Sequence, residues 1–145
     1  MTLNQSKAEP PASPARLRSV ADLRGPAGRI EALLNTGRDD APFAALVCHP
    51  HPLFGGTMHN KVVYHAMKAF QSFGLPVLRF NFRGAGLSEG THDQGHGEVG
   101  DLRAALDWLQ REYERPILFA GKLEQMQLAL SGWIETHFVP AVAPK

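Results

Sequence analysis

The sequence of 145 residues lacks the features that define several classes of protein. Its single cysteine, Cys48, excludes an internal disulfide framework and a zinc site built from several cysteines. Lys and Arg number 15 against 14 for Asp and Glu, so the basic excess of a nucleic-acid-binding protein is absent. No apolar run approaches the about 20 residues that span a membrane, and the N-terminus lacks the apolar core of a secretory signal. We therefore expect a soluble, cytoplasmic protein that binds neither nucleic acid nor membrane.

Hydrophobic patterning predicts one domain over residues 18–138, preceded by a polar, proline-bearing flexible tail over 1–17 and followed by a tail over 139–145. An opening hairpin is predicted over 18–35, with its second strand at about 29–34. Continuous short apolar runs predict buried strands, and apolar residues at helical spacing predict helices. The strands are expected at 43–48, 75–82 and 116–120, and the helices at 60–73, 98–113 and 123–137.

The predicted elements alternate between strand and helix after the opening hairpin. Such alternation is typical of an α/β fold with a mostly parallel sheet and helices on both faces. Ligands of such sheets bind beyond the carboxyl ends of the strands. Any chemistry should therefore come from the loops over residues 49–57 and 83–97 and from the segment after Gly121.

The first loop begins His49-Pro50-His51-Pro52 and allows two interpretations. The two imidazoles suggest a metal, but a metal needs at least three ligands, and no carboxylate lies close by in sequence, so we expect no metal and no cofactor. The alternative is an anion site made by backbone N–H groups. Because proline has no N–H, the donors would be His51 and Leu53. A rigid turn without function remains a third possibility.

The second loop contains Gly86-Leu87-Ser88-Glu89-Gly90, which matches the G-x-S-x-G pattern of serine nucleophiles. That pattern works only on a sharp turn directly between a strand and a helix. Here three residues separate it from its strand, and the next helix begins near Glu98. We therefore predict that Ser88 is a decoy that hydrogen-bonds locally. The flanking polar residues are expected to be solvated: His92, Asp93 and His96. The glycines are expected to permit positive φ in a structural loop: Gly84, Gly86 and Gly90.

Taken together, the HPHPxxGG and N-F-R-G-x-G-x-S-x-G loops resemble those of the α/β-hydrolase superfamily, in particular bacterial-type predicted hydrolases, from about Val20 to Gly121. The resemblance implies a partial α/β-hydrolase fold, a mostly parallel sheet flanked by helices. It also implies serine esterase chemistry on a small ester-like substrate. By the same correspondence the His51 N–H is similar to the oxyanion-hole donor, and residues 83–90 are similar to the family's structural glycine loop.

The resemblance stops after Gly121. In the family, the strand matching 116–120 runs into the nucleophile elbow, but here the chain continues Lys122-Leu123 with no serine. Residues 122–138 instead resemble the family's closing helix, which implies an internal deletion of the later strands, the acid and the catalytic histidine. We therefore predict a catalytically inactive hydrolase-like chain; a small binding module or a non-functional remnant is the alternative. An uncovered sheet edge from Pro116 to Ala120 would favour self-association.

Overall fold

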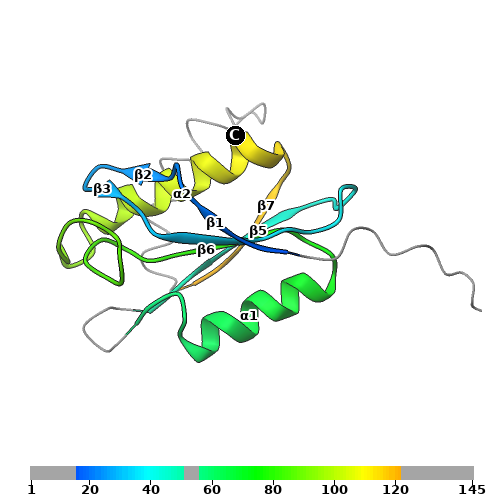
Figure 1. The fold of residues 1–145 in the computed structure, drawn as a ribbon, viewed down its shortest axis with the longest axis horizontal. Helices are drawn as coiled ribbons and strands as arrows, with labels where there is room; N and C mark the ends of the chain where they lie inside the picture. The colour runs from blue at the N-terminus through cyan, green and yellow to red at the C-terminus, as the bar shows by residue number, and fades with distance from the viewer. Residues whose placement is uncertain (1–15, 51–55, 122–145) are drawn as a thin grey trace, which may run out of the picture.

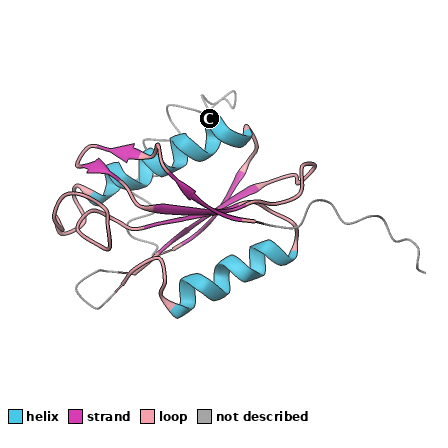
Figure 2. Ribbon diagram, in the orientation of Figure 1, coloured by secondary structure: helices cyan, strands magenta, loops and turns pink. Residues whose placement is uncertain are grey.

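The computed structural model describes residues 16–50 and 56–121 as a sheet between two helices (Figure 1). The five strands lie in the order β1 (Leu17–Val20), β4 (Ala32–Asn35), β6 (Val77–Phe80), β5 (Ala44–Cys48) and β7 (Ile117–Ala120). Helices α1 (Lys61–Ser72) and α2 (Glu98–Tyr113) cover opposite faces of this sheet (Figure 2). The predicted α/β class, with helices on both faces, is confirmed.

The alternating part of the chain forms the parallel part of the sheet. Strand β5 pairs in parallel with β6 and β7, whereas β4 pairs antiparallel with β1 and β6. All five residues of β5 are buried, as a strand with neighbours on both sides and a helix on each face should be. The carboxyl ends of β5, β6 and β7 therefore meet at one edge of the sheet.

The opening segment differs from the predicted hairpin. Strand β4 begins at Ala32, so the predicted second strand at 29–34 is placed too early. A separate small hairpin, β2 (Arg24–Gly25) and β3 (Gly28–Arg29), interrupts the connection from β1. The Arg29 N–H donates to the Glu89 carboxylate at 2.7 Å, so a contact distant in sequence holds this turn. Strand β1 begins at Leu17, within the predicted tail.

Both helices begin and end close to their predicted limits. The Asn60 side chain caps α1 by accepting the Val62 N–H at 2.8 Å. Gly74 follows α1 with φ of 78°, the left-handed conformation that ends many helices. The larger buried core lies under α2, and a smaller one lies under α1. The smaller core is formed by five buried residues: Ala45, Val47, Val63, Met67 and Val77.

Strand β7 is less buried than predicted. Its residues are partly or fully exposed, and Leu118 retains 36% of its accessible surface. Among the described strands β7 pairs with β5 alone, which leaves it at the end of the sheet. The expectation of a buried strand was therefore wrong. The predicted helix over 123–137 lies outside the described residues. Within the described ranges, no helix is both long and apolar enough to cross a membrane.

Candidate functional site

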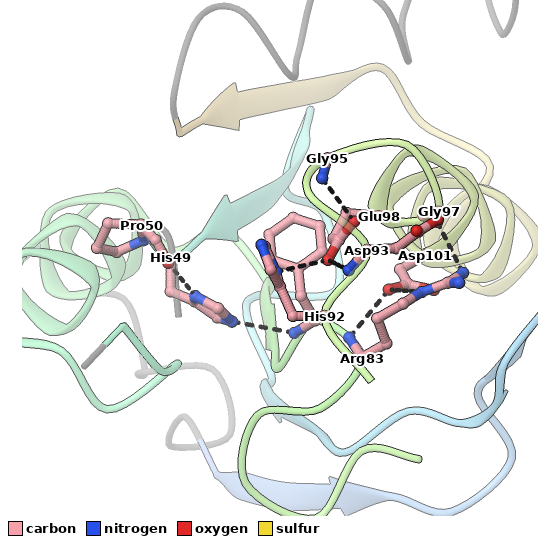
Figure 3. A network of polar contacts seen from close by, with 10 residues as sticks. His49, Pro50, Arg83, His92, Asp93, Gly95, Gly97, Glu98 and Asp101 are labelled. Atoms are coloured by element: carbon pink, nitrogen blue, oxygen red, sulfur yellow. Dashed lines mark hydrogen bonds and ion pairs between the residues drawn. The ribbon is translucent and has the colours of Figure 1, made fainter. Parts of the chain in front are cut away.

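His49 joins the loops that follow β5 and β6. The residue is 1% exposed, and its Nε2 accepts the Phe82 N–H at 3.0 Å (Figure 3). A nitrogen that accepts carries no proton, so the proton lies on Nδ1, which donates to the Pro50 carbonyl at 2.5 Å. Burial lowers the pKa of His49, although the Pro50 hydrogen bond opposes this shift. The ring is therefore a neutral structural bridge with both nitrogens engaged.

The predicted backbone donors, His51 and Leu53, lie outside the described residues, and their role stays a prediction. The chain after them is held at Met58. Its N–H donates to Asn81 Oδ1 at 2.8 Å, and its carbonyl accepts from Arg79 Nη1 at 3.4 Å. The described residues on the two sides of that segment, His49 and Met58, therefore both contact β6 or the residues that follow it.

Ser88 lies in the glycine-rich loop with its side chain buried. Its hydroxyl donates to the Asn81 carbonyl at 2.6 Å and accepts the Glu31 N–H at 2.8 Å. Both contacts are to backbone, and both tie the loop to the start of β4 and the end of β6. The contact with Asn81 is close in sequence, as expected, whereas Glu31 is 57 residues away; the assignment of Ser88 as a decoy remains a prediction.

The three glycines predicted as structural all have positive φ: 79° at Gly84, 52° at Gly86 and 91° at Gly90. Gly86 lies against a polar contact in which Asn81 Nδ2 donates to Glu31 Oε1 at 2.7 Å. The same carboxylate oxygen accepts the Leu87 N–H at 2.8 Å. Glu31 is thus a loop anchor that sequence analysis missed.

An ion pair fixes the glycine loop to the first turn of α2. Arg83 Nη2 lies 2.9 Å from Asp101 Oδ1 and donates to the Gly97 carbonyl at 2.7 Å (Figure 3). The Arg83 backbone N–H also donates to Asp101 Oδ2 at 2.9 Å. Hydrogen bonding to Asp101 raises the pKa of Arg83, against the effect of burial.

Glu98 is a second buried anchor beside this pair. It accepts the N–H groups of Asp93 at 2.8 Å and Gly95 at 2.9 Å. Burial acts to raise its pKa, but these hydrogen bonds and the charge of His92 outweigh that effect, and the pKa of Glu98 is lowered. His92 Nδ1 lies 2.9 Å from Glu98 Oε2, and its side chain is 17% exposed. The expectation that His92 is solvated was therefore wrong, whereas Asp93 and His96 are exposed.

The sequence contains a signal for two of the carboxylates that hold the glycine loop, and the sequence analysis did not use it. A long loop with five glycines has many backbone N–H groups and few side chains, and its buried donors need acceptors. The carboxylates close by in sequence, Glu98 and Asp101, are such acceptors. Glu31 is distant in sequence and could be located only from the structure.

A cavity of about 320 Å³ lies at the carboxyl ends of β5 and β7, beside α1. Its lining is mostly apolar: Val47, Cys48, Pro50, Asn60, Val62, Val63, Ala66, Ala120 and Gly121. Cys48 is buried, and desolvation raises the pKa of its thiol, as suits a core residue. Among residues 16–50 and 56–121, no three His, Cys, Asp or Glu side chains are grouped to hold a metal ion.

No protein-family model matches the chain. An α/β serine hydrolase without a lid from Xanthomonas campestris is 35% identical, with a TM-score of 0.73 over 85% of this chain and 59% of its own. An α/β serine hydrolase homologue from Coxiella burnetii is 34% identical, with a TM-score of 0.69 over 90% of this chain and 61% of its own. An uncharacterized protein from Rickettsia prowazekii is 54% identical over 89 residues, which are 61% of this chain and 37% of that protein.

The structural neighbours are therefore α/β serine hydrolases, and the described sheet with its two helices is a partial α/β-hydrolase fold, as predicted. The chain spans about 60% of the length of the two solved hydrolases and 37% of the Rickettsia protein.

Proposed function

We propose that this chain is an α/β-hydrolase-type protein of the serine esterase class that does not itself hydrolyse esters. The class is supported by the two serine hydrolases at 34–35% identity. A small ester-like substrate is proposed for an intact α/β-hydrolase of this class, and not for this chain. The loss of activity is supported chiefly by the chain after β7, where Gly121 is followed by Lys122 and Leu123 instead of a nucleophile elbow.

Acyl transfer needs a nucleophile, a base and oxyanion donors within mutual reach. Ser88 is a poor nucleophile because two backbone groups occupy its hydroxyl. His49 is a poor base because Nε2 accepts the Phe82 N–H and Nδ1 donates to Pro50. The chain keeps the parts that hold an oxyanion loop: His49 and Met58 on either side of His51 and Leu53, and the glycine loop. It needs no cofactor for this role.

The proposal is tested with p-nitrophenyl acetate and a fluorophosphonate probe, with an esterase of known activity as the positive reference. We expect neither an acyl-enzyme burst nor covalent labelling, and the Ser88→Ala variant should give the same traces as the unmodified chain. Stoichiometric labelling that disappears in Ser88→Ala would overturn the proposal and make Ser88 a nucleophile.

A further inference from the structure

Arg79 is a buried cation on β6, the middle strand of the described sheet. Only 4% of its surface is exposed. Because side chains alternate along a strand, Arg79 lies on the same side as Val77, which packs in the core under α1. Its Nη1 donates to the Met58 carbonyl at 3.4 Å, which is long for such a bond, and its buried Nε has no hydrogen-bond partner among the described residues. A guanidinium has five N–H donors, so this one can take a further acceptor.

No carboxylate neutralises this charge in the described part of the chain. Arg79 is not a member of any ion pair formed by residues 16–50 and 56–121. Residues 41–88 contain no Asp and no Glu, so the undescribed residues 51–55 cannot supply a carboxylate either. Burial lowers the pKa of Arg79, although the nearby Tyr64 opposes this shift. Because a buried charge without a counter-charge is costly, the position favours an anion.

The flank of α1 beside Arg79 is basic. Tyr64 interacts electrostatically with Arg79, lies near the start of α1 and is 45% exposed. Lys61 and Lys68 lie three residues before and four residues after Tyr64, which are the spacings that bring side chains to one face of a helix. Both lysines are exposed, and α1 contains no Asp or Glu. The surface next to the buried guanidinium therefore carries two more positive charges.

This flank is not the one that borders the cavity beside β7. Val62 lines that cavity, and Tyr64 is two residues further along, about 200° around the helix. On the sheet, Leu33 of β4 is directly opposite Arg79, so its side chain lies on the same face. Helix α1 packs on β5 and β6, and Leu33 is half-buried. The short route from solvent to the guanidinium therefore lies between Tyr64 and Leu33.

We propose that Arg79 binds the phosphate group of free phosphate or of a small phosphomonoester, with Lys61 and Lys68 at the rim of the site. The planar guanidinium pairs with two oxygens of one phosphate, and the free Nε–H is one of the donors. Phosphate suits three cations better than a carboxylate does, because it carries about 1.5 to 2 negative charges at neutral pH. The proposal does not depend on the chain being a hydrolase.

The test measures binding of phosphate to the full chain by isothermal titration calorimetry, in chloride buffer of fixed ionic strength. Arg79→Met removes the guanidinium without leaving an unpaired charge, so this variant should fold. We expect it to raise the Kd of phosphate at least about tenfold. Lys61→Gln and Lys68→Gln should each raise the Kd about two- to fivefold, since exposed charges are screened. The control is Arg24→Met, at an exposed arginine on β2, which should bind phosphate as the unmodified chain does.

Two other ligands define the class of anion. Acetate should bind at least about tenfold more weakly than phosphate. Methyl phosphate distinguishes the two sources: tighter binding than phosphate would assign a phosphomonoester, and weaker binding would assign free phosphate. In ¹⁵N–¹H spectra the Arg79 Nε–H signal should shift with phosphate and be absent from Arg79→Met. This signal reports contact with the ligand, which a merely structural role of Arg79 would not produce.

Three results would overturn the proposal. The first is the absence of saturable phosphate binding to the unmodified chain. The second is an equal Kd in Arg79→Met, which would assign the phosphate to surface lysines. The third concerns the side-chain carboxylates of the undescribed segments, Glu9, Glu124 and Glu135. If changing all three to glutamine tightened phosphate binding at least about tenfold, the occupant of Arg79 would be a carboxylate of the chain itself.

Discussion

At Gly86, the loop after β6 leaves no room for a side chain. Its φ is 52°, and an added Cβ would lie 2.3 Å from Asn81 Nδ2 and 2.6 Å from Glu31 Oε1. Gly86→Ala must therefore displace the contact between Asn81 and Glu31. We expect it to lower the free energy of unfolding, measured in urea, by about 1–3 kcal/mol more than a substitution that adds backbone strain alone.

Gly95→Ala is the matched control for this effect. Gly95 has φ of 94°, so alanine is strained there as well, but among the described residues no atom beyond its two chain neighbours lies within 4 Å of its added Cβ. The excess loss in Gly86→Ala therefore reports the clash. Equal losses in the two variants would show that the contact between Asn81 and Glu31 gives way without cost.

The neutral state of His49 should make stability depend on pH. Burial holds the pKa of His49 below its ordinary value of 6.5. As pH falls below 6.5, the unfolded chain binds a proton that the folded ring does not, so stability falls until the pH reaches the folded pKa. His49→Gln keeps a donor and an acceptor but does not titrate. In urea unfolding at pH 7.5 and 5.5, the unmodified chain should therefore lose more stability than His49→Gln.

The steepest loss that one such group can cause is about 1.4 kcal/mol per pH unit. Glu98 does not affect the comparison between pH 7.5 and 5.5. Its pKa is lowered from 4.5, so its contribution to stability is lost only at more acidic pH. Parallel pH profiles for the unmodified chain and His49→Gln would contradict the assignment of His49 as a buried neutral bridge.

Individual residues show where sequence analysis was limited. The positive φ of the glycines follows from their place between a strand and a helix, and the buried Cys48 follows from a continuous apolar run. The hydrogen bond between His49 and Phe82 does not follow from the sequence, because Phe82 is 33 residues away. His92 was mispredicted for the same reason: polarity alone indicates solvent, and only the fold of the loop brings its ring to Glu98.

At the scale of elements, the pair of Arg83 and Asp101 connects the loop after β6 to the first turn of α2. Asp101 is fully buried and accepts both the guanidinium and the Arg83 backbone N–H. Asp101→Ala would leave these donors without their acceptor. We expect a loss of about 3–5 kcal/mol in the free energy of unfolding, measured in urea.

Glu112→Ala on the same helix is the control. Glu112 forms an exposed ion pair with Arg18 at 3.5 Å, and such pairs contribute at most about 1 kcal/mol. If the two variants were equally stable, the contact of Arg83 with Asp101 would be no stronger than a surface pair, and another contact would have to hold the loop on α2.

The elements were predicted best where local pattern and tertiary environment agree. Helix α2 has its predicted limits because its apolar stripe faces the larger core. The pairing of β2 with β3 was missed, since strands of two residues carry no hydrophobic period, and a side chain from the glycine loop supports their turn. Burial of β7 was overestimated because an apolar run indicates a strand but not the number of its neighbours.

Across the whole molecule, the described sheet ends in two strands with different surroundings. Strand β1 pairs antiparallel with β4, and its Leu17 is exposed. Strand β7 lies beside the parallel strand β5 at the other end of the described sheet. In the family that the chain resembles, further strands would lie beyond it in the sheet. The helix predicted over 123–137 lies outside the described residues, and a helix could in any case cover only a face of β7, because it cannot pair with the unpaired N–H and C=O groups along a strand edge.

We therefore expect the chain to self-associate through the edge from Pro116 to Ala120, where the segment Ile117 to Ala120 carries no charge. Leu118→Lys should reduce the associated fraction seen by light scattering, because a lysine on an edge strand opposes pairing with another chain. Leu17→Lys, on the opposite edge strand, should leave it unchanged. Val62→Asp, which disturbs the cavity without touching β7, should not reduce it either. A monomer with cooperative unfolding in the unmodified chain would contradict this expectation and imply that the β7 edge is closed within the same molecule.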